Sequence, residues 1–227
     1  MPITTNFTIA NSLPGQTQDH VLVFLKPINA SSNFQYYAWQ DLDPSQGSSQ
    51  SFPYLIDLSV QVFDPETYAS KQGAIAKPVS INPGQLFQAV NPNGQSPYID
   101  TTTNLNQDGN QILSTQAGIL NNCNQSGYAC IGLNWFNGNQ KVVTAGAGPA
   151  NHLNFGKTIT LEFEPTLYFM AAEPTIVGPN FTLQDYSRMT PYTFKAGTSA
   201  VTVTWSRTSV CGEDNFSFNP PPATIGL

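Results

Sequence analysis

Charged residues are scarce in this chain. Asp, Glu, Lys and Arg make up 10% of its 227 residues, against roughly 25% in a typical soluble domain. Only eight residues are Lys or Arg, and they form no cluster. Binding to nucleic acid or to anionic lipid needs several basic side chains close together. The sequence therefore argues against both partners, and we expect neutral Asn, Gln, Ser and Thr to form most of the wetted surface.

Long apolar runs are also missing. No segment approaches the roughly 18 consecutive apolar residues of a membrane-spanning helix, so we expect no transmembrane segment. The amino-terminal residues include neither a basic start nor an apolar stretch, and we expect no signal peptide. The expected location is the cytoplasm, or the exterior after export without a visible leader.

Groups for catalysis are few. The chain has two histidines and no Gly-x-Ser-x-Gly nucleophile motif. Two carboxylate pairs, Glu162 with Glu164 and Asp41 with Asp43, have a spacing that suits glycoside hydrolysis. The first pair equally fits the wet face of a strand, and the second fits a turn. We therefore expect no enzymatic activity.

The three cysteines leave two interpretations open. Cys123 and Cys130 flank a short polar loop, and a disulfide between them would stabilise the fold by roughly 2–3 kcal/mol. Cys211 would then be unpaired or would pair between chains. The alternative is three idle thiols in a reducing compartment.

Most of the periodic signal has a period of two residues. Apolar and polar residues alternate over 55–63, 158–164 and 200–207, which predicts strands with one buried face and one wet face. The apolar runs 21–25 and 167–171 predict strands that are buried on both faces. Strand is therefore the dominant expected element.

Weaker patterns complete the expected elements. Further strands are predicted at 6–10, 34–39 and 85–90, and the dipeptide Asn137-Gly138 predicts a two-residue hairpin turn between 130–136 and 139–145. Short helices are predicted after Asp64 and within 110–122.

The sequence thus predicts an all-β fold. We expect a single domain over residues 1–227, built as an antiparallel two-sheet β-sandwich with one or two short helices in its loops. Jelly-roll and immunoglobulin-like topologies both stay open. Residues 220–227 are expected to form a Pro-rich tail.

One loop has the residue pattern of a calcium site. Asn104, Asn106 and Asp108 place side-chain oxygens at alternate positions, and Gly109 follows where such a loop bends. The loop offers a single carboxylate, and Thr115 stands where the motif requires a bidentate Glu. The alternative is a polar loop with an Asp-Gly turn. We therefore expect no cofactor, with calcium as the alternative.

Aromatic residues beside polar loops indicate a ligand site. Tyr37 and Trp39 share one face of a predicted strand, and Trp135 lies next to the predicted hairpin turn. Sugars are recognised by amide and hydroxyl hydrogen bonds with an aromatic ring beneath the sugar, so these three residues are the predicted ligand-binding residues. The alternative is that they belong to the core, where most strand aromatics lie.

Three functions follow from these patterns. The first is a non-catalytic, lectin-like binding protein with a glycan as its partner. The second is a structural subunit that assembles with itself into a shell, filament or inclusion, because low charge weakens repulsion between copies. The third is a pore-forming protein, although its alternating segments are shorter than the roughly 9–11 residues of a spanning strand.

Overall fold

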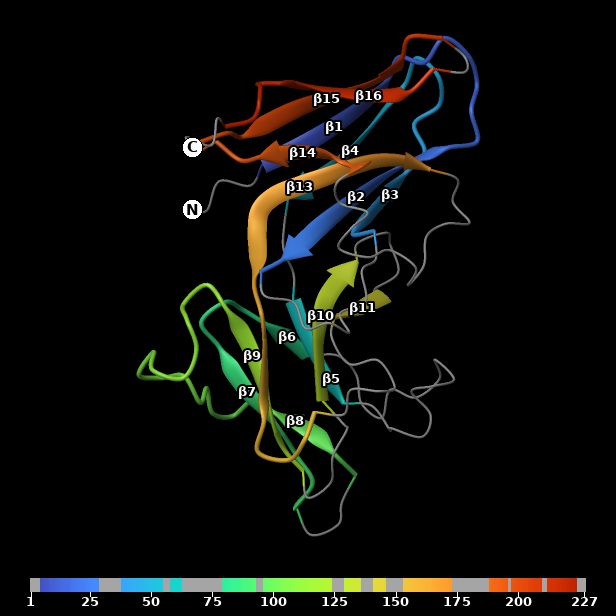
Figure 1. Ribbon diagram of the computed structural model, residues 1–227. Helices are drawn as coiled ribbons and strands as arrows, with labels where there is room; N and C mark the ends of the chain where they lie inside the picture. The colour runs from blue at the N-terminus through green and yellow to red at the C-terminus, as the bar shows by residue number, and fades with distance from the viewer. Residues whose placement is uncertain are drawn as a thin grey trace. The chain divides into compact units, whose positions relative to one another are not determined.

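The computed structural model describes residues 5–28, 38–54, 58–62, 79–92, 96–123, 129–135, 141–145, 153–172, 188–195, 197–209 and 212–223. These residues form an all-β structure of four sheets, each with four strands (Figure 1). No helix occurs within these ranges. The all-β prediction is confirmed.

Contacts divide the chain into two compact units. Unit 1 comprises Met1–Lys26, Tyr36–Leu55 and Phe163–Leu227, and unit 2 comprises Pro27–Gln35 and Ile56–Glu162. The sequence of unit 2 therefore interrupts that of unit 1. This division is based on contacts within the chain and does not show whether the two units fold independently. The single domain expected over residues 1–227 therefore stays a prediction.

Unit 1 contains two of the sheets. The first has the order β16-β15-β1-β4, made by β1 (Thr5–Asn11), β4 (Ser49–Tyr54), β15 (Ala200–Arg207) and β16 (Asp214–Asn219). The second has the order β14-β13-β2-β3, made by β2 (His20–Pro27), β3 (Gln40–Leu42), β13 (Phe163–Ala172) and β14 (Thr190–Thr193). Strand β1 pairs antiparallel with β4 and parallel with β15, so the two ends of the sequence meet in one sheet (Figure 1).

Aromatic rings from both sheets meet in unit 1. The Phe7 ring of β1 lies 6.2 Å from the Phe169 ring of β13 and 5.6 Å from the Tyr192 ring of β14, centroid to centroid. These distances are in the range in which aromatic pairs attract. All three side chains are fully buried. The alternation predicted for 200–207 is confirmed, since Val201, Val203 and Trp205 are buried in β15.

Unit 2 contains the other two sheets. One has the order β11-β10-β5-β6, made by β5 (Leu58–Val62), β6 (Val79–Ile81), β10 (Ala129–Trp135) and β11 (Lys141–Ala145). The other has the order β12-β9-β7-β8, made by β7 (Leu86–Val90), β8 (Tyr98–Asp100), β9 (Ala117–Asn122) and β12 (Thr158–Leu161). Strands β7 and β9 run parallel.

The sheets differ from the prediction in number and direction. Four sheets occur where two were expected, and the pairs β1–β15 and β7–β9 are parallel. A parallel pair joins strands that are far apart in sequence or linked by a crossover. Local periodicity does not contain that information.

The helix predicted within 110–122 is wrong, because residues 117–122 form β9. Gly118 disfavours a helix, and in β9 it allows a close approach: a Cβ there would lie 3.0 Å from Leu86 Cδ1. The helix predicted after Asp64 lies outside the described residues.

The hairpin of β10 and β11 is confirmed, but its register differs. Trp135 pairs with Lys141, whereas a two-residue turn at Asn137-Gly138 would pair Trp135 with Gln140. The turn itself lies outside the described residues. A shift of one residue exchanges the faces of a strand, so turn residues alone did not fix the register.

Candidate functional site

Of the three aromatic residues predicted to bind a ligand, Trp39 is buried in the core. Trp39 is 1% exposed and packs edge-on against Phe52 and Tyr54, with ring centroids 5.6 and 5.8 Å away. It belongs to the core of unit 1, as the alternative interpretation expected. Trp135 ends β10 in unit 2, and Tyr37 lies outside the described residues.

In the predicted calcium loop, the side-chain oxygens bind the protein's own backbone. Asn104 Oδ1 accepts hydrogen bonds from the N–H groups of Leu86 and Asn106. The Oδ1 atom of buried Asn106 accepts from the N–H groups of Gln111 and Ile112. Asp108 is exposed. Among the described residues, no cluster of three or more His, Cys, Asp or Glu is arranged to hold a metal ion. The loop is built as a turn, and calcium binding stays a prediction.

Cys123 does not form the disulfide that one of the two interpretations gave it. Cys123 is a free, fully buried thiol that directly follows β9. Cys130 belongs to β10, which lies in the other sheet of unit 2. Burial raises the pKa of the Cys123 thiol to about 11. The alternative of an idle buried thiol therefore describes Cys123, because the thiolate is the reactive form.

The carboxylate pairs bind separate partners. Glu164 lies 2.8 Å from Lys26 Nζ and accepts the Tyr168 hydroxyl at 2.8 Å, whereas Glu162 accepts a hydrogen bond from Gln116. Asp41 Oδ1 forms a hydrogen bond of 2.6 Å with His20 Nδ1. Glu164, Glu162 and Asp41 therefore each have a different partner.

His20 and Asp41 form the only arrangement that resembles part of a catalytic triad in the described ranges. Such a dyad serves hydrolysis when the other imidazole nitrogen contacts a nucleophile. Here the nearest charged neighbour of Nε2 is Asp43, at 3.9 Å. No hydroxyl or thiol of the described residues hydrogen-bonds to His20. Among the residues that the structure describes, no nucleophile completes a triad around His20 and Asp41.

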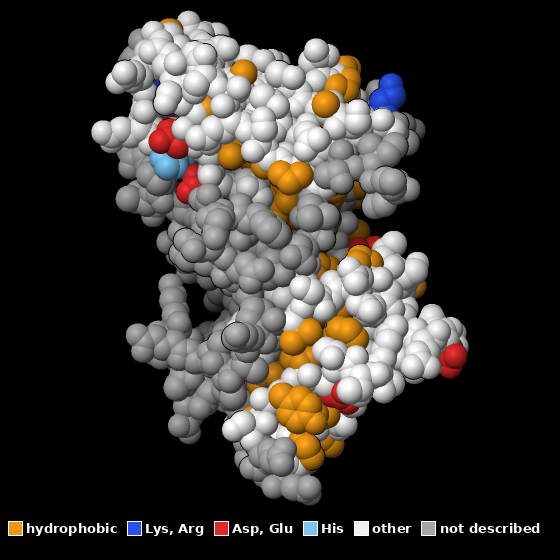
Figure 2. Space-filling model, turned by 180° about the vertical axis from the view of Figure 1, so that it is seen from behind, with side chains coloured by type: hydrophobic (Ala, Val, Ile, Leu, Met, Phe, Trp, Pro, Cys, Tyr) orange, Lys and Arg blue, Asp and Glu red, His pale blue; other side chains and the backbone are white. Residues whose placement is uncertain are grey.

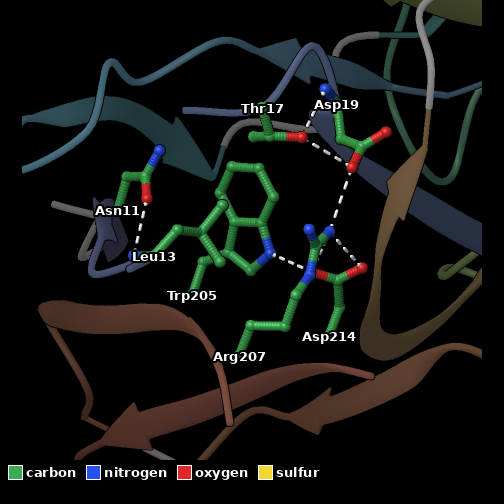
Figure 3. A network of polar contacts seen from close by, with 7 residues as sticks. All are labelled: Asn11, Leu13, Thr17, Asp19, Trp205, Arg207 and Asp214. Atoms are coloured by element: carbon green, nitrogen blue, oxygen red, sulfur yellow. Dashed lines mark hydrogen bonds and ion pairs between the residues drawn. The ribbon is translucent and has the colours of Figure 1, made fainter. Parts of the chain in front are cut away.

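Another charged cluster in unit 1 is fully engaged (Figure 3). The Arg207 guanidinium donates to both carboxylate oxygens of Asp214 at 2.9 Å and to Asp19 at 3.0 Å. The Trp205 indole N–H donates to Asp214, and the Thr17 hydroxyl donates to Asp19. The cluster ties the segment before β2 to the β15–β16 hairpin. We infer that this cluster stabilises the fold of unit 1.

A different surface in unit 2 combines an aromatic ring with amides. Strand register places Tyr98 of β8 beside Val90 of β7, and Val90 beside Asn122 of β9. Two residues along the strands, Asp100 lies beside Gln88, and Gln88 beside Leu120. We call these six side chains the amide–tyrosine face: Gln88, Val90, Tyr98, Asp100, Leu120 and Asn122.

Burial shows that these six side chains share one face of the sheet. The alternate residues Phe87, Ala89, Ile99 and Ile119 are at most 8% exposed. Because successive side chains on a strand point to opposite faces, the six lie on the other side. Tyr98 is 43% exposed, so its ring is open to solvent.

The polar side chains of this face form a chain of hydrogen bonds. Asn122 Nδ2 donates to Gln88 Oε1 at 3.2 Å, and Gln88 Nε2 donates to Asp100 Oδ2 at 3.0 Å. Thr102 donates to Asp100 Oδ1 through its hydroxyl and its backbone N–H. These bonds, from Thr102 first and Gln88 next, lower the pKa of Asp100. The carboxylate is therefore ionised at neutral pH and orients both amides.

This arrangement offers three kinds of contact in one place: an aromatic ring, a carboxylate and oriented amides. Within the described ranges, the outer oxygen of Asn122 accepts no hydrogen bond. A carboxylate has about four acceptor positions, and three on Asp100 are occupied. One acceptor position is left for a ligand hydroxyl.

Sequence reasoning missed this face for a local reason. The strand 85–90 was predicted, but β8 has only three residues and was not predicted as a strand. The sequence Tyr98-Ile99-Asp100 does alternate, which was the available signal. The pairing of β7 with β9 depends on residues about thirty positions apart, and no local pattern reports it.

On the face of the molecule that Figure 2 shows, most of the described surface is uncharged, as the composition predicted. Among the described residues, no helix is long and apolar enough to cross a membrane. No family model, no curated protein and no solved structure matches this chain.

Proposed function

We propose that the protein is a non-catalytic carbohydrate-binding protein and that the amide–tyrosine face of unit 2 is its binding surface. The observation that carries this proposal is the register of β7, β8 and β9. It places an exposed Tyr98 ring next to the hydrogen-bonded chain of Asn122, Gln88 and Asp100.

The chemistry of the face suits a neutral polyhydroxylated ligand. The apolar side of a sugar ring packs on an aromatic ring, and its hydroxyl groups pair with amides and carboxylates. Residues two apart on a strand are separated by about 7 Å, so a ring on Tyr98 brings its edge hydroxyls toward Asp100 and Gln88. Val90 and Leu120 supply apolar contact beside them.

The engagement of charged groups in unit 1 supports recognition over catalysis. In the described part of unit 1, the charged cluster around Arg207 and the His20–Asp41 pair are engaged internally. Asp100 is the one carboxylate on the amide–tyrosine face. Hydrolysis of a glycosidic bond needs two carboxyl groups.

We also infer that each unit is a two-sheet β-sandwich. In unit 1 the rings of Phe7, Phe169 and Tyr192 connect the two sheets. In unit 2 the buried residues Ala89, Ile99 and Ile119 give the sheet of β7, β8 and β9 an apolar face that requires cover. The amide–tyrosine face is then the outer surface of a sandwich.

An array of neutral oligosaccharides, followed by calorimetric titration of the best binder, tests the proposed function. We expect Tyr98→Ala to weaken binding at least tenfold, which corresponds to about 1.4 kcal/mol, and Tyr98→Phe to retain most of it. Asp100→Asn is expected to weaken binding by about ten- to a hundredfold, since hydrogen bonds to charged groups contribute about 1.5–3 kcal/mol.

The control is Leu113→Ala, which removes an exposed apolar side chain of unit 2 that is not part of the face. It is expected to bind like the unmodified protein. An array without any binder would refute the proposal. Equal losses for Tyr98→Ala and Leu113→Ala would also count against this location.

A further inference from the structure

The first sheet of unit 1 has an exposed face without a single charged or aromatic side chain. Strand alternation turns the residues between the buried ones toward solvent in β1, β4, β15 and β16. We call this surface the hydroxyl face. It consists of Asn6, Thr8, Ala10, Ser49, Ser51, Pro53, Ala200, Thr202, Thr204, Ser206, Asn215, Ser217 and Asn219.

Register arranges these small side chains in rows across the sheet. One row runs Ser51, Thr8, Thr202, Asn219. The next row runs Ser49, Ala10, Thr204, Ser217. The Thr8 and Ser51 hydroxyls share a hydrogen bond of 2.8 Å. No side chain in either row is longer than Asn, so the surface is even and rich in both donors and acceptors.

The composition of this face excludes several partners. It has no aromatic ring on which a sugar would stack and no cation that would bind phosphate. Its hydroxyl and amide groups give no apolar patch for a membrane. A partner for this face is therefore itself neutral, even and rich in hydrogen-bonding groups.

We propose that the hydroxyl face binds a second copy of this chain. The chain has a formal net charge of −6, so copies repel each other over about 8 Å at physiological ionic strength. The repulsion is least where two uncharged faces meet. A face that contains both donors and acceptors is complementary to itself, as a two-fold symmetric contact requires.

The shape of the sheet agrees with such a contact. Sheets with the usual twist pack face to face with their strands about 30° apart. Short side chains such as Ser, Ala and Thr let the two sheets approach closely. Twist therefore does not prevent two hydroxyl faces from meeting.

The size of the face sets the strength of association. Four strands about 4.8 Å apart and about 20 Å long cover roughly 400 Å², so a dimer would bury roughly 800 Å² in total. Stable interfaces bury about 1,200–2,000 Å². We therefore expect a weak contact, with a dissociation constant on the order of 1 mM or somewhat below.

Sedimentation velocity of the full chain from about 10 μM to about 2 mM tests the proposal, because that range brackets the expected dissociation constant. The informative variant is Thr202→Lys, at the centre of the face. It lowers the net negative charge, so an effect of overall charge would strengthen association. A direct contact through the face predicts the opposite, because two lysines would meet in the interface.

The matched control is Ser80→Lys, which makes the same charge change at an exposed strand position of unit 2. We expect the unmodified protein and Ser80→Lys to associate with rising concentration, and Thr202→Lys to remain monomeric throughout. Ser217→Lys, on the edge strand β16, repeats the test at a second position. An equimolar mixture of Thr202→Lys and Thr202→Glu is expected to regain association.

Three results would overturn the proposal. One is a monomeric unmodified protein at about 2 mM, the upper end of the range chosen for a weak interface. Another is association of Thr202→Lys and Ser217→Lys equal to that of the unmodified protein. The third is an equal loss in Ser80→Lys, which would show that the loss does not depend on the hydroxyl face.

Discussion

Replacing Arg207 by Met removes the cation that holds two carboxylates of unit 1 together. Asp19 and Asp214 are each 26% exposed and accept hydrogen bonds from Arg207. Breaking a buried ion pair costs about 3–5 kcal/mol, whereas an exposed pair contributes about 0–1 kcal/mol. Because these carboxylates are about three-quarters buried, we expect a loss of about 3 kcal/mol in the free energy of unfolding.

Thermal and urea unfolding measure this loss. For a chain of this size each kcal/mol shifts Tm by about 2–4 °C, so Arg207→Met is expected to lower Tm by about 6–12 °C. Arg207→Lys keeps the charge but not the bidentate geometry. Its Tm is expected to lie between those of the unmodified protein and Arg207→Met. The control Arg188→Met removes an exposed arginine and is expected to change stability by at most about 0.5 kcal/mol.

The pH dependence gives a second check. Hydrogen bonds from Thr17 first and then Arg207 lower the pKa of Asp19 from its ordinary value of 3.8. A lowered folded-state pKa adds stability above pH 3.8, and this stability is lost as the pH falls through the folded-state value. The difference between Arg207→Met and the unmodified protein is therefore expected to shrink as the pH falls below 3.8. An equal difference at neutral and acid pH, or none at neutral pH, would refute the assignment.

Two further predictions concern buried groups of unit 2. Asn106→Ala removes a side chain that forms hydrogen bonds with the backbone of Gly84, Gln111 and Ile112. We expect the free energy of unfolding to fall by about 3 kcal/mol, because buried backbone groups lose their partners. Urea unfolding measures this loss, and a change below about 0.5 kcal/mol would contradict the prediction. Cys123 is fully buried, and burial raises the pKa of its thiol to about 11. We therefore expect a thiol reagent to modify Cys123 only after unfolding in urea, as measured by mass spectrometry. Rapid labelling of Cys123 in the native protein would contradict this prediction.

Of the three segments with strict alternation, 200–207 forms a half-buried strand as predicted, whereas 158–164 is divided between β12, which ends at Leu161, and β13, which begins at Phe163. Ala200–Arg207 forms β15 with the buried residues that the pattern indicates. In a half-buried strand, the alternation of apolar and polar residues identifies the buried face directly. The run 21–25 is buried throughout, as predicted. Burial of Ser59 and Gln61 in β5 was not predictable, because polar side chains at alternate positions are typical of a wet face.

The candidate site was less predictable, because it depends on pairings between distant strands. Trp39 had the residue type of a sugar-binding residue, but its position beside Phe52 of β4 buries it. Tyr98 lies on a strand too short to show a period. Its neighbours Val90 and Asn122 come from a hairpin partner and from a parallel strand, and parallel pairing leaves no local signal.

Chemical-shift mapping by amide NMR, during titration with the best-binding oligosaccharide, tests carbohydrate binding at the amide–tyrosine face most directly. Our account predicts that the largest changes occur in β7, β8 and β9, with side-chain amide shifts at Gln88 and Asn122, and that Tyr98→Ala abolishes them at the same sugar concentration. Saturable changes confined to other strands, or no changes with any sugar, would contradict it.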